Sequence, residues 1–171
     1  MANHSGETGE IRKFCDLLGK FDTGVLITHS GNNLHGRPMA IAQLEELPRG
    51  CNLWFVAGSD TPKMEEIRSN EQVLVTFQNR NDQFLTLSGR AELVRDPQKI
   101  AELWRDSFKV WFPAGKDDPN LMLIQVHANE GEYWDNGGLK KVAFMLEAAK
   151  AYATGDRVSV KEDGQHGKVS L

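Results

Sequence analysis

The sequence predicts a mainly β (α+β) fold in which antiparallel strands form a small barrel with flanking helices. Five or six segments have the β-branched and aromatic composition of strands and are bounded by polar turns. Two short helical segments interrupt these strands, yet strand and helix do not alternate regularly as they do in a doubly wound parallel sheet. This succession of elements favours a small antiparallel barrel.

The first expected element is an amphipathic helix that begins near Glu10. Its apolar residues recur at the spacing of one helix face, and Thr8 can cap the first turn. These apolar residues are Ile11, Phe14, Leu17, Leu18 and Phe21. The helix is expected to end near Gly19.

The expected strands follow one another across short turns. They cover residues 24–30, 34–43, 53–57, 73–78, 84–94 and 121–126. Gly31 and the two asparagines after it suit a hairpin turn, and residues 79–82 form a polar turn. The fifth strand is long enough to bend at Gly89, and residues 130–134 are candidates to extend the sixth.

Two short helices are expected between the strands. The first covers residues 62–68 and can be capped by Asp60 or Thr61. The second opens at Asp96 and runs through Phe108.

The C-terminal part differs from the rest in composition. Residues 138–151 carry apolar side chains at helical spacing, so we expect a further helix there. Residues 154–171 are polar and contain glycine, so we expect a flexible tail. The sequence thus predicts one domain over residues 1–153, including this helix, followed by the tail.

Bulk composition narrows the classes of function. The chain has 171 residues, a formal net charge of -4 and a pI near 5.7. Its basic residues are scattered, so we expect no nucleic-acid partner. No apolar run approaches the ~20 residues of a membrane helix and the N-terminus is polar, so we expect a soluble protein with no membrane partner. The two cysteines lie far apart without CxxC spacing or a secretory signal, which fits a cytoplasmic location.

The residues that usually carry metal or hydrolytic chemistry show no suitable pattern. Cys15 and Cys51 lack the spacing of a zinc site, and the five histidines lack metal-ligand spacing. The sequence also has no GxSxG motif. Asp117 and Asp118 are adjacent, which is more typical of a structured turn than of a catalytic pair. We therefore expect no metal, and the catalytic residues stay unknown.

A phosphate-binding site is suggested by residues around the expected helix 62–68. An arginine fork, an ammonium, a hydroxyl and helix N-terminal amides together hold a phosphate well. Arg37, Lys63 and Thr61 with the helix start at Pro62 supply all four. Spacing alone leaves open whether they converge on a ligand or are solvated surface charges with a helix cap.

A flavin attached to such a phosphate would need flat, apolar walls for its ring. The four tryptophans are candidates for these walls, and they are equally suited to a core. They are Trp54, Trp104, Trp111 and Trp134. Trp134, beyond the last strand, is the one most expected at a rim or interface.

Several short motifs in a fixed order carry a family resemblance. They are GRPMA at 36–40, LWFV at 53–56, TPK at 61–63, SGRA at 88–91, WFPAGKDDP at 111–119 and YWD at 133–135. With these motifs the sequence resembles the general stress protein 26 branch of the pyridoxamine 5'-phosphate oxidase-like, FMN-binding split-barrel proteins, from about Phe14 to Asp135.

The resemblance implies a six-stranded antiparallel split β-barrel that binds flavin mononucleotide (FMN). It assigns the FMN phosphate to Arg37, Thr61 and Lys63. It also implies that main-chain groups of two strands line the flavin ring. These groups belong to Pro38, Met39, Phe55, Val56 and Ala57.

The resemblance further implies a homodimer with FMN at the interface between its subunits. Trp111 or Trp134 of the second subunit is then expected to complete each pocket. One departure limits the analogy, because residues 138–171 show nothing like the C-terminal substrate-binding segment of the vitamin B6 oxidases. Oxidation of pyridoxamine phosphate is therefore not expected.

Two kinds of function are compatible with this reading. The first is an FMN-dependent oxidoreductase that transfers a hydride or electrons to an unknown small-molecule substrate or from an unknown donor. The second is a non-catalytic stress-response protein that stores or senses the flavin. The sequence leaves open FAD, a deazaflavin or haem in place of FMN, because a fold does not determine its ligand.

Overall fold

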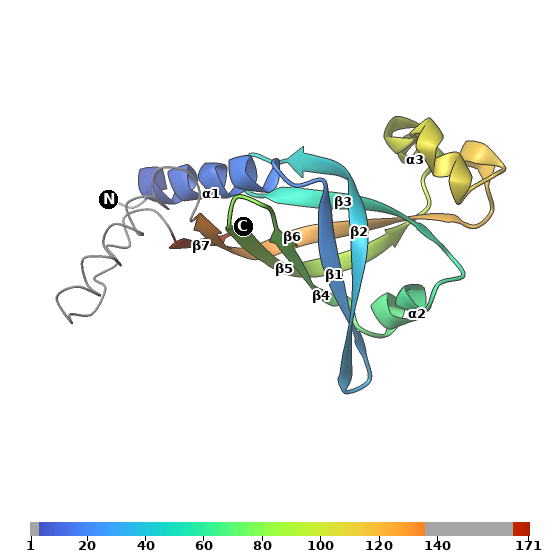
Figure 1. The fold of residues 1–171 in the computed structure, drawn as a ribbon, viewed down its shortest axis with the longest axis horizontal. Helices are drawn as coiled ribbons and strands as arrows, with labels where there is room; N and C mark the ends of the chain where they lie inside the picture. Colours follow the sequence, from blue (N-terminus) through green and yellow to red (C-terminus); the bar gives the residue numbers. More distant parts are fainter. Residues whose placement is uncertain (1–3, 136–165) are drawn as a thin grey trace.

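The computed structural model describes residues 4–135 and 166–171 and shows a closed barrel of six antiparallel strands (Figure 1). The strands are β1 (Thr23–Ser30), β2 (Asn33–Glu46), β3 (Cys51–Gly58), β4 (Gln72–Gln78), β5 (Gln83–Val94) and β6 (Leu121–Asp135). They neighbour one another in the order β3-β2-β1-β4-β5-β6, and pairing of β3 with β6 closes the ring. The predicted six-stranded antiparallel split barrel is thus confirmed.

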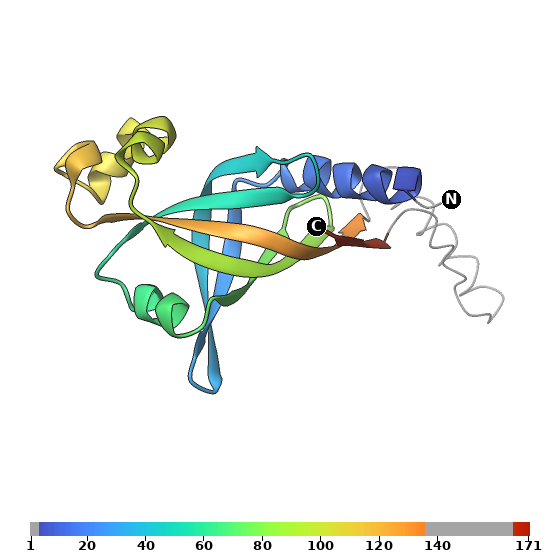
Figure 2. The same ribbon diagram turned by 180° about the vertical axis from the view of Figure 1, so that it is seen from behind.

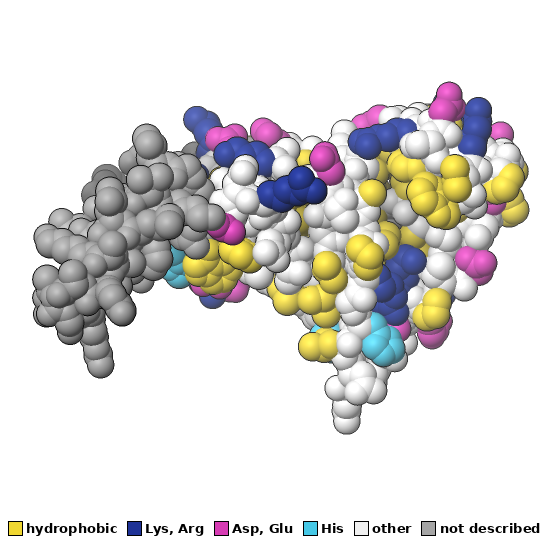
Figure 3. Space-filling model, viewed as in Figure 1, with side chains coloured by type: hydrophobic (Ala, Val, Ile, Leu, Met, Phe, Trp, Pro, Cys, Tyr) yellow, Lys and Arg dark blue, Asp and Glu magenta, His cyan; other side chains and the backbone are white. Residues whose placement is uncertain are grey.

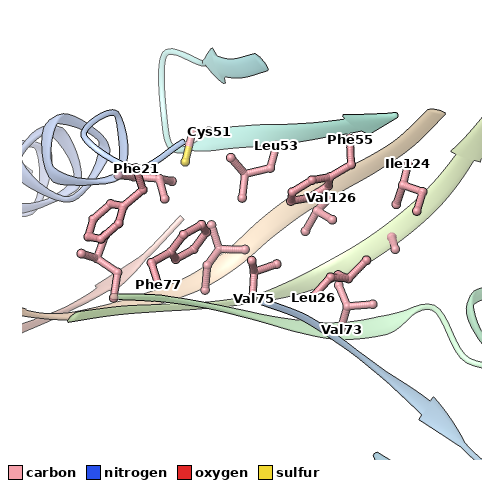
Figure 4. Close-up of a cluster of buried hydrophobic side chains, with 14 of the residues drawn as sticks. Phe21, Leu26, Cys51, Leu53, Phe55, Val73, Val75, Phe77, Ile124 and Val126 are labelled. Carbon is pink, nitrogen blue, oxygen red and sulfur yellow. The ribbon is translucent and has the colours of Figure 1, made fainter. Parts of the chain in front are cut away.

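The barrel interior is filled by side chains that alternate along the strands. Leu53 and Phe55 of β3 point inward with Leu26, Val75 and Val126, and Figure 4 shows them facing one another between the strands. All five are fully buried. Because successive side chains of a strand face opposite sides of the sheet, Trp54 points outward instead.

A smaller cluster covers the outer side of β3 and β6. Trp54 packs there against Ile100 and Leu103 of helix α3 (Pro97–Leu103), and against Phe112. Two 3-10 turns follow α3, namely η1 (Asp106–Val110) and η2 (Gly115–Asp117). Both faces of β3 are therefore buried, and the α3 to η2 segment is anchored beside the end of this strand.

Helix α1 (His4–Leu18) covers the opposite end of the barrel from α2 (Pro62–Ser69) and α3, as both ribbon views show (Figures 1 and 2). Its side chains Phe14, Leu17 and Leu18 join the main core and are nearly inaccessible to solvent. The helix starts earlier than the sequence predicts but ends as expected. Within the described residues no helix has the length and hydropathy to cross a membrane.

The helix expected from Asp96 to Phe108 is interrupted in the structure. α3 ends at Leu103 because the next two residues, Trp104 and Arg105, adopt extended backbone angles. The guanidinium of Arg105 donates a hydrogen bond to the carbonyl of Ala42 at 2.8 Å. The chain therefore turns back over β2 and β3 instead of continuing as one helix.

The flexible tail predicted over residues 154–171 is wrong for its last residues. His166–Ser170 form strand β7, which pairs with β6 from Glu130 to Trp134, and Val169 is buried. The physical reason is the length of β6. Its pairing with β3 ends at His127, so the second half of β6 has an edge that β7 can join. Residues 136–165, including the expected helix over 138–151, lie outside the described residues.

Candidate functional site

A cavity of about 420 Å³ opens where β2, the end of β3, the start of α2 and the η1 region meet. Pro38, Met39 and Ala40 form its β2 wall. Figure 3 shows hydrophobic side chains gathered at the right-hand end of this face, with a hollow and basic side chains below them. The cavity thus has one apolar and one cationic side.

Most of the residues that the sequence predicts for the site line this cavity. They are Pro38, Met39, Val56, Ala57, Thr61, Lys63 and Trp111. The structure adds aromatic neighbours that the sequence did not single out for the site, Phe108 and Phe112. These aromatic residues come from the chain segment that Arg105 turns back over the barrel.

Three predicted site residues are not among those that line the cavity, namely Phe55, Trp134 and Arg37. The side chain of Phe55 is in the barrel core, so only its main-chain groups, for which the site role was predicted, could face a ligand, and that prediction stays a prediction. Trp134 stacks on His166 with 5.2 Å between the ring centroids and borders a separate hollow over β1, β4 and β5. Within one chain, Trp134 is therefore not part of the cavity.

The loop between β3 and α2 is held by Asn120. The Asn120 side-chain oxygen accepts hydrogen bonds from the Ser59 hydroxyl at 2.9 Å and the Asp60 amide at 3.1 Å. The Ser59 amide donates to the Asn120 carbonyl at 2.7 Å. Asp118 in turn accepts from the Asn120 amide, which confirms the structured turn expected around this residue. The loop that carries Thr61 and leads into α2 is therefore tied to the segment between η2 and β6.

Thr61 occupies the N-cap position of α2 but does not act as a side-chain cap. Its hydroxyl donates to the Gly58 carbonyl at 2.7 Å and accepts a hydrogen bond from the Lys63 ammonium at 2.9 Å. The expected cap from Asp60 or Thr61 is thus not formed within the described residues. At the start of α2, Pro62 has no amide proton and the Met64 amide donates to the Thr61 carbonyl at 3.0 Å, so the Lys63 amide is the one that the helix start offers to a ligand.

Lys63 is a buried cation beside another cation. Burial lowers its pKa, and the nearby charge of Arg37 lowers the pKa further, while Asp60 and Glu66 oppose both effects. An anion placed here would gain from both positive charges. This is the chemistry expected of a phosphate site.

Arg37 does not line the cavity directly, because its guanidinium is bound to a polar cluster beside it. Nη2 contacts the Glu66 carboxylate at 2.7 Å, and Nη1 donates to the Thr28 hydroxyl at 2.8 Å. His35 also contacts Glu66, at 2.8 Å from Nδ1. Sequence reasoning missed Glu66, Thr28 and His35.

A weak signal for this cluster exists in the sequence. His35 and Arg37 are two residues apart, so they lie on the same face of β2, and Thr28 pairs with His35 in the hairpin. Glu66 follows Lys63 by three residues, so the two share one face of α2. Glu65 is also a glutamate and precedes Glu66 in the same helix, so the sequence does not distinguish the two. Only the docking of α2 on β1 shows which one is buried.

Comparison with known proteins agrees with this architecture. The family model described as pyridoxamine 5'-phosphate oxidase like matches residues 9–159. The chain belongs to the pyridoxamine 5'-phosphate oxidase-like family. General stress protein 26 of Bacillus subtilis (strain 168) is 24% identical over 139 residues, which cover 79% of this chain and 95% of that protein.

Solved structures of other members of the pyridoxamine 5'-phosphate oxidase-like family have the same fold. General stress protein 26 from Bacillus anthracis superposes with a TM-score of 0.63 and 21% identity, covering 75% of this chain and 95% of the other. The general stress FMN/FAD binding protein from Xanthomonas citri has a TM-score of 0.64 and 28% identity, covering 77% and 92%. The resemblance to the general stress protein 26 branch is confirmed.

Proposed function

We propose that the cavity binds FMN and that the protein uses the bound flavin as an oxidoreductase toward an unknown small-molecule substrate or donor. The observation that carries this proposal is the pairing of the buried Lys63 ammonium with the Thr61 hydroxyl, within electrostatic reach of Arg37. The similarity to the Xanthomonas citri FMN/FAD binding protein supports a flavin as the ligand.

The cationic end of the cavity suits the phosphate of FMN. Lys63 supplies an ammonium and its backbone amide at the start of α2, Arg37 a guanidinium and Thr61 a hydroxyl. Arg37 stands just outside the lining, so a phosphate would contact it at the boundary between the cavity and the Glu66 cluster.

The other end of the cavity suits an isoalloxazine ring. Met39, Val56 and Ala57 offer apolar walls from two strands, and Phe108 and Trp111 add aromatic faces. The volume of about 420 Å³ falls in the range of small-molecule sites. When bound, FMN supplies a ring that accepts or donates a hydride, and the protein holds and shields it.

We also propose that a second copy of the chain completes the site in a homodimer. Trp111 lines the cavity yet has 67% of its surface accessible, so it lies at the rim, and Val110, the residue before it, is 78% accessible. Large apolar side chains at such a rim are suited to a partner surface. Trp134 is available for this role only from the second subunit, because it lies away from the cavity of its own chain.

A non-catalytic role in flavin storage or sensing is the second candidate. It is favoured by the cavity lining, in which Asp60 and Lys63 are the only titratable side chains among the described residues. Both belong to the proposed phosphate end. The ring end thus offers no acid or base from the described part of this chain.

The binding proposal is tested by FMN titration of the purified protein, followed through quenching of flavin fluorescence. Replacing Arg37 or Lys63 by alanine removes a charge-assisted contact of ~1.5 to 3 kcal/mol, so each variant should bind FMN about 10- to 100-fold more weakly. Lys109→Ala, an exposed change on η1, should leave affinity unchanged. Equal affinity for all four proteins would contradict the clamp.

Turnover is tested separately with the FMN-loaded protein. An oxidoreductase should oxidise a reduced nicotinamide or another donor with saturable kinetics. Stoichiometric FMN binding with no turnover across a panel of donors would support storage or sensing instead. Mass spectrometry of the ligand released from the protein would distinguish FMN from FAD, a deazaflavin or haem.

A further inference from the structure

Glu66 places a carboxylate next to the cations that are proposed to bind a phosphate. Its side chain is buried, with 8% of its surface accessible, and it lies one turn after Lys63 on α2. A negative charge at this place opposes anion binding by simple Coulomb repulsion. The contacts of Glu66 with its neighbours explain why a carboxylate is found at this position.

Glu66, Thr28 and the Arg37 guanidinium form a closed cycle of hydrogen bonds. Arg37 Nη2 contacts both carboxylate oxygens, at 2.9 Å and 2.7 Å. Arg37 Nη1 donates to the Thr28 hydroxyl at 2.8 Å, and this hydroxyl donates to Glu66 Oε2 at 2.6 Å. Thr28 is fully buried, so this cycle has a rigid base in β1.

We propose that Glu66, together with Thr28, is a positioning residue that holds Arg37 in place for the phosphate of the cofactor. The inference rests on the proposed function. A guanidinium has five N–H donors, and the contacts of Arg37 with Glu66, the Thr28 hydroxyl and the His35 carbonyl use its two terminal nitrogens, so the Nε–H donor is left for a further anion. An unrestrained arginine would have to be ordered when the ligand binds, which lowers affinity by up to about tenfold.

His35 forms the outer side of the same cluster. Its Nδ1 contacts Glu66 Oε1 at 2.8 Å, and its side chain is about half exposed. The carboxylate is thus contacted by Thr28, His35 and Arg37, from two strands of one hairpin. Glu66 also ties α2, which carries Lys63, to the strand that carries Arg37, so the two cations keep a constant separation.

The test measures FMN affinity for the wild type, Glu66→Gln, Arg37→Ala and the double variant. Glutamine has the size of glutamate but lacks its charge and turns an amide donor toward the Arg37 cluster. We expect Glu66→Gln to weaken FMN binding about tenfold. In the Arg37→Ala background the same change should not weaken binding, because there is no guanidinium left to position.

The matched control is Glu65→Gln on the same helix. Glu65 is 78% exposed, and its ion pair within the described part of the chain is a surface contact with Arg68 at 3.5 Å, yet this change removes the same charge. Its FMN affinity should equal that of the wild type. If Glu66→Gln does not fold, Thr28→Val should weaken binding in its place, and Thr28→Ser, which retains the hydroxyl, should restore it.

Three results separate the failure of this inference from that of the proposed function. Wild-type affinity or tighter binding in Glu66→Gln overturns the inference alone. The same loss in the presence and absence of Arg37 also overturns it, because Glu66 would then only support the fold of α2. No saturable FMN binding by the wild type overturns the proposed function and the inference together.

Discussion

At the scale of single residues, Glu66 has the most perturbed acidity of the site. Burial opposes its ionisation, but hydrogen bonds from Thr28, His35 and Arg37, together with the Arg37 charge, outweigh burial and lower its pKa to about 2. A buried carboxylate tolerates its charge only with such partners. The cluster therefore stabilises the fold as well as holding Arg37.

This shift predicts a pH-dependent stability. The folded pKa of about 2 lies below the ordinary value of 4.5, so the contribution of Glu66 is complete above about pH 4.5 and is lost as the pH falls toward 2. Its upper limit is about 3 kcal/mol. Urea unfolding of the wild type and Glu66→Gln should show a stability difference that shrinks over this range. A difference that stays constant with pH would contradict the prediction.

The residues of the site were only partly predictable. Arg37, Thr61 and Lys63 belong to motifs in a recognisable order, and their types suit a phosphate. Glu66 could not be distinguished from Glu65, because burial of one of two adjacent glutamates depends on how α2 docks. Chemical type can be read from a sequence, whereas the choice between two faces of a short helix requires tertiary contacts.

At the scale of elements, α1 is held against the barrel through close contact with β6. A Cβ atom on Gly131 of β6 would overlap the ring of Phe14, which is fully buried. The absence of a side chain at Gly131 therefore gives the Phe14 ring its place in the core.

Replacing Gly131 by alanine should accordingly destabilise the protein by about 1 to 3 kcal/mol, because the core must shift to accept one methyl group. The control is Gly9→Ala in α1, where a Cβ atom would meet no neighbour within 4 Å. That change should instead stabilise the helix by about 0.5 to 1 kcal/mol. Urea unfolding of both variants tests the pair, and an equal effect of the two changes would count against the packing described.

The elements that the sequence mispredicted depend on distant partners. β7 has a single large apolar residue, Val169, so its local pattern is weak, and it becomes a strand because β6 extends past β3. The break after α3 similarly depends on Arg105 reaching the Ala42 carbonyl of β2. Periodicity reports on neighbours along the chain and not on such partners.

At the scale of the whole molecule, β6 is the barrel strand that pairs with three other strands. It pairs with β5 along most of its length, with β3 over its first half and with β7 over its second. By contrast, the tip of the β1–β2 hairpin projects from the barrel, and residues 31–36 are exposed (Figure 1).

This arrangement predicts a gradient of hydrogen exchange. Amides in residues 121–128 should exchange slowest, because they open only when the barrel opens, and amides in residues 30–36 should exchange fastest among the strands. Exchange followed by mass spectrometry of peptides measures both. Similar protection of the two segments would contradict this prediction, because the hairpin tip would then open only together with the whole barrel.

The barrel itself was predictable, since its strands carry strong β patterns and short turns. The cavity was less so, because its aromatic wall comes from residues 108–112, which reach it only after the chain turns at Arg105. Trp134 illustrates the limit, since its place in the motif order resembles that of a site residue while its own chain holds it at another face.

The late position of β6 in the chain also bears on how the protein is made. A ribosome completes β1 to β5 before it reaches Leu121, so β3 emerges with one edge that stays unpaired until the closing strand follows. Unpaired edges of apolar strands invite association between chains. The nascent chain is therefore most exposed to aggregation in the interval between synthesis of Gly58 and synthesis of the closing strand.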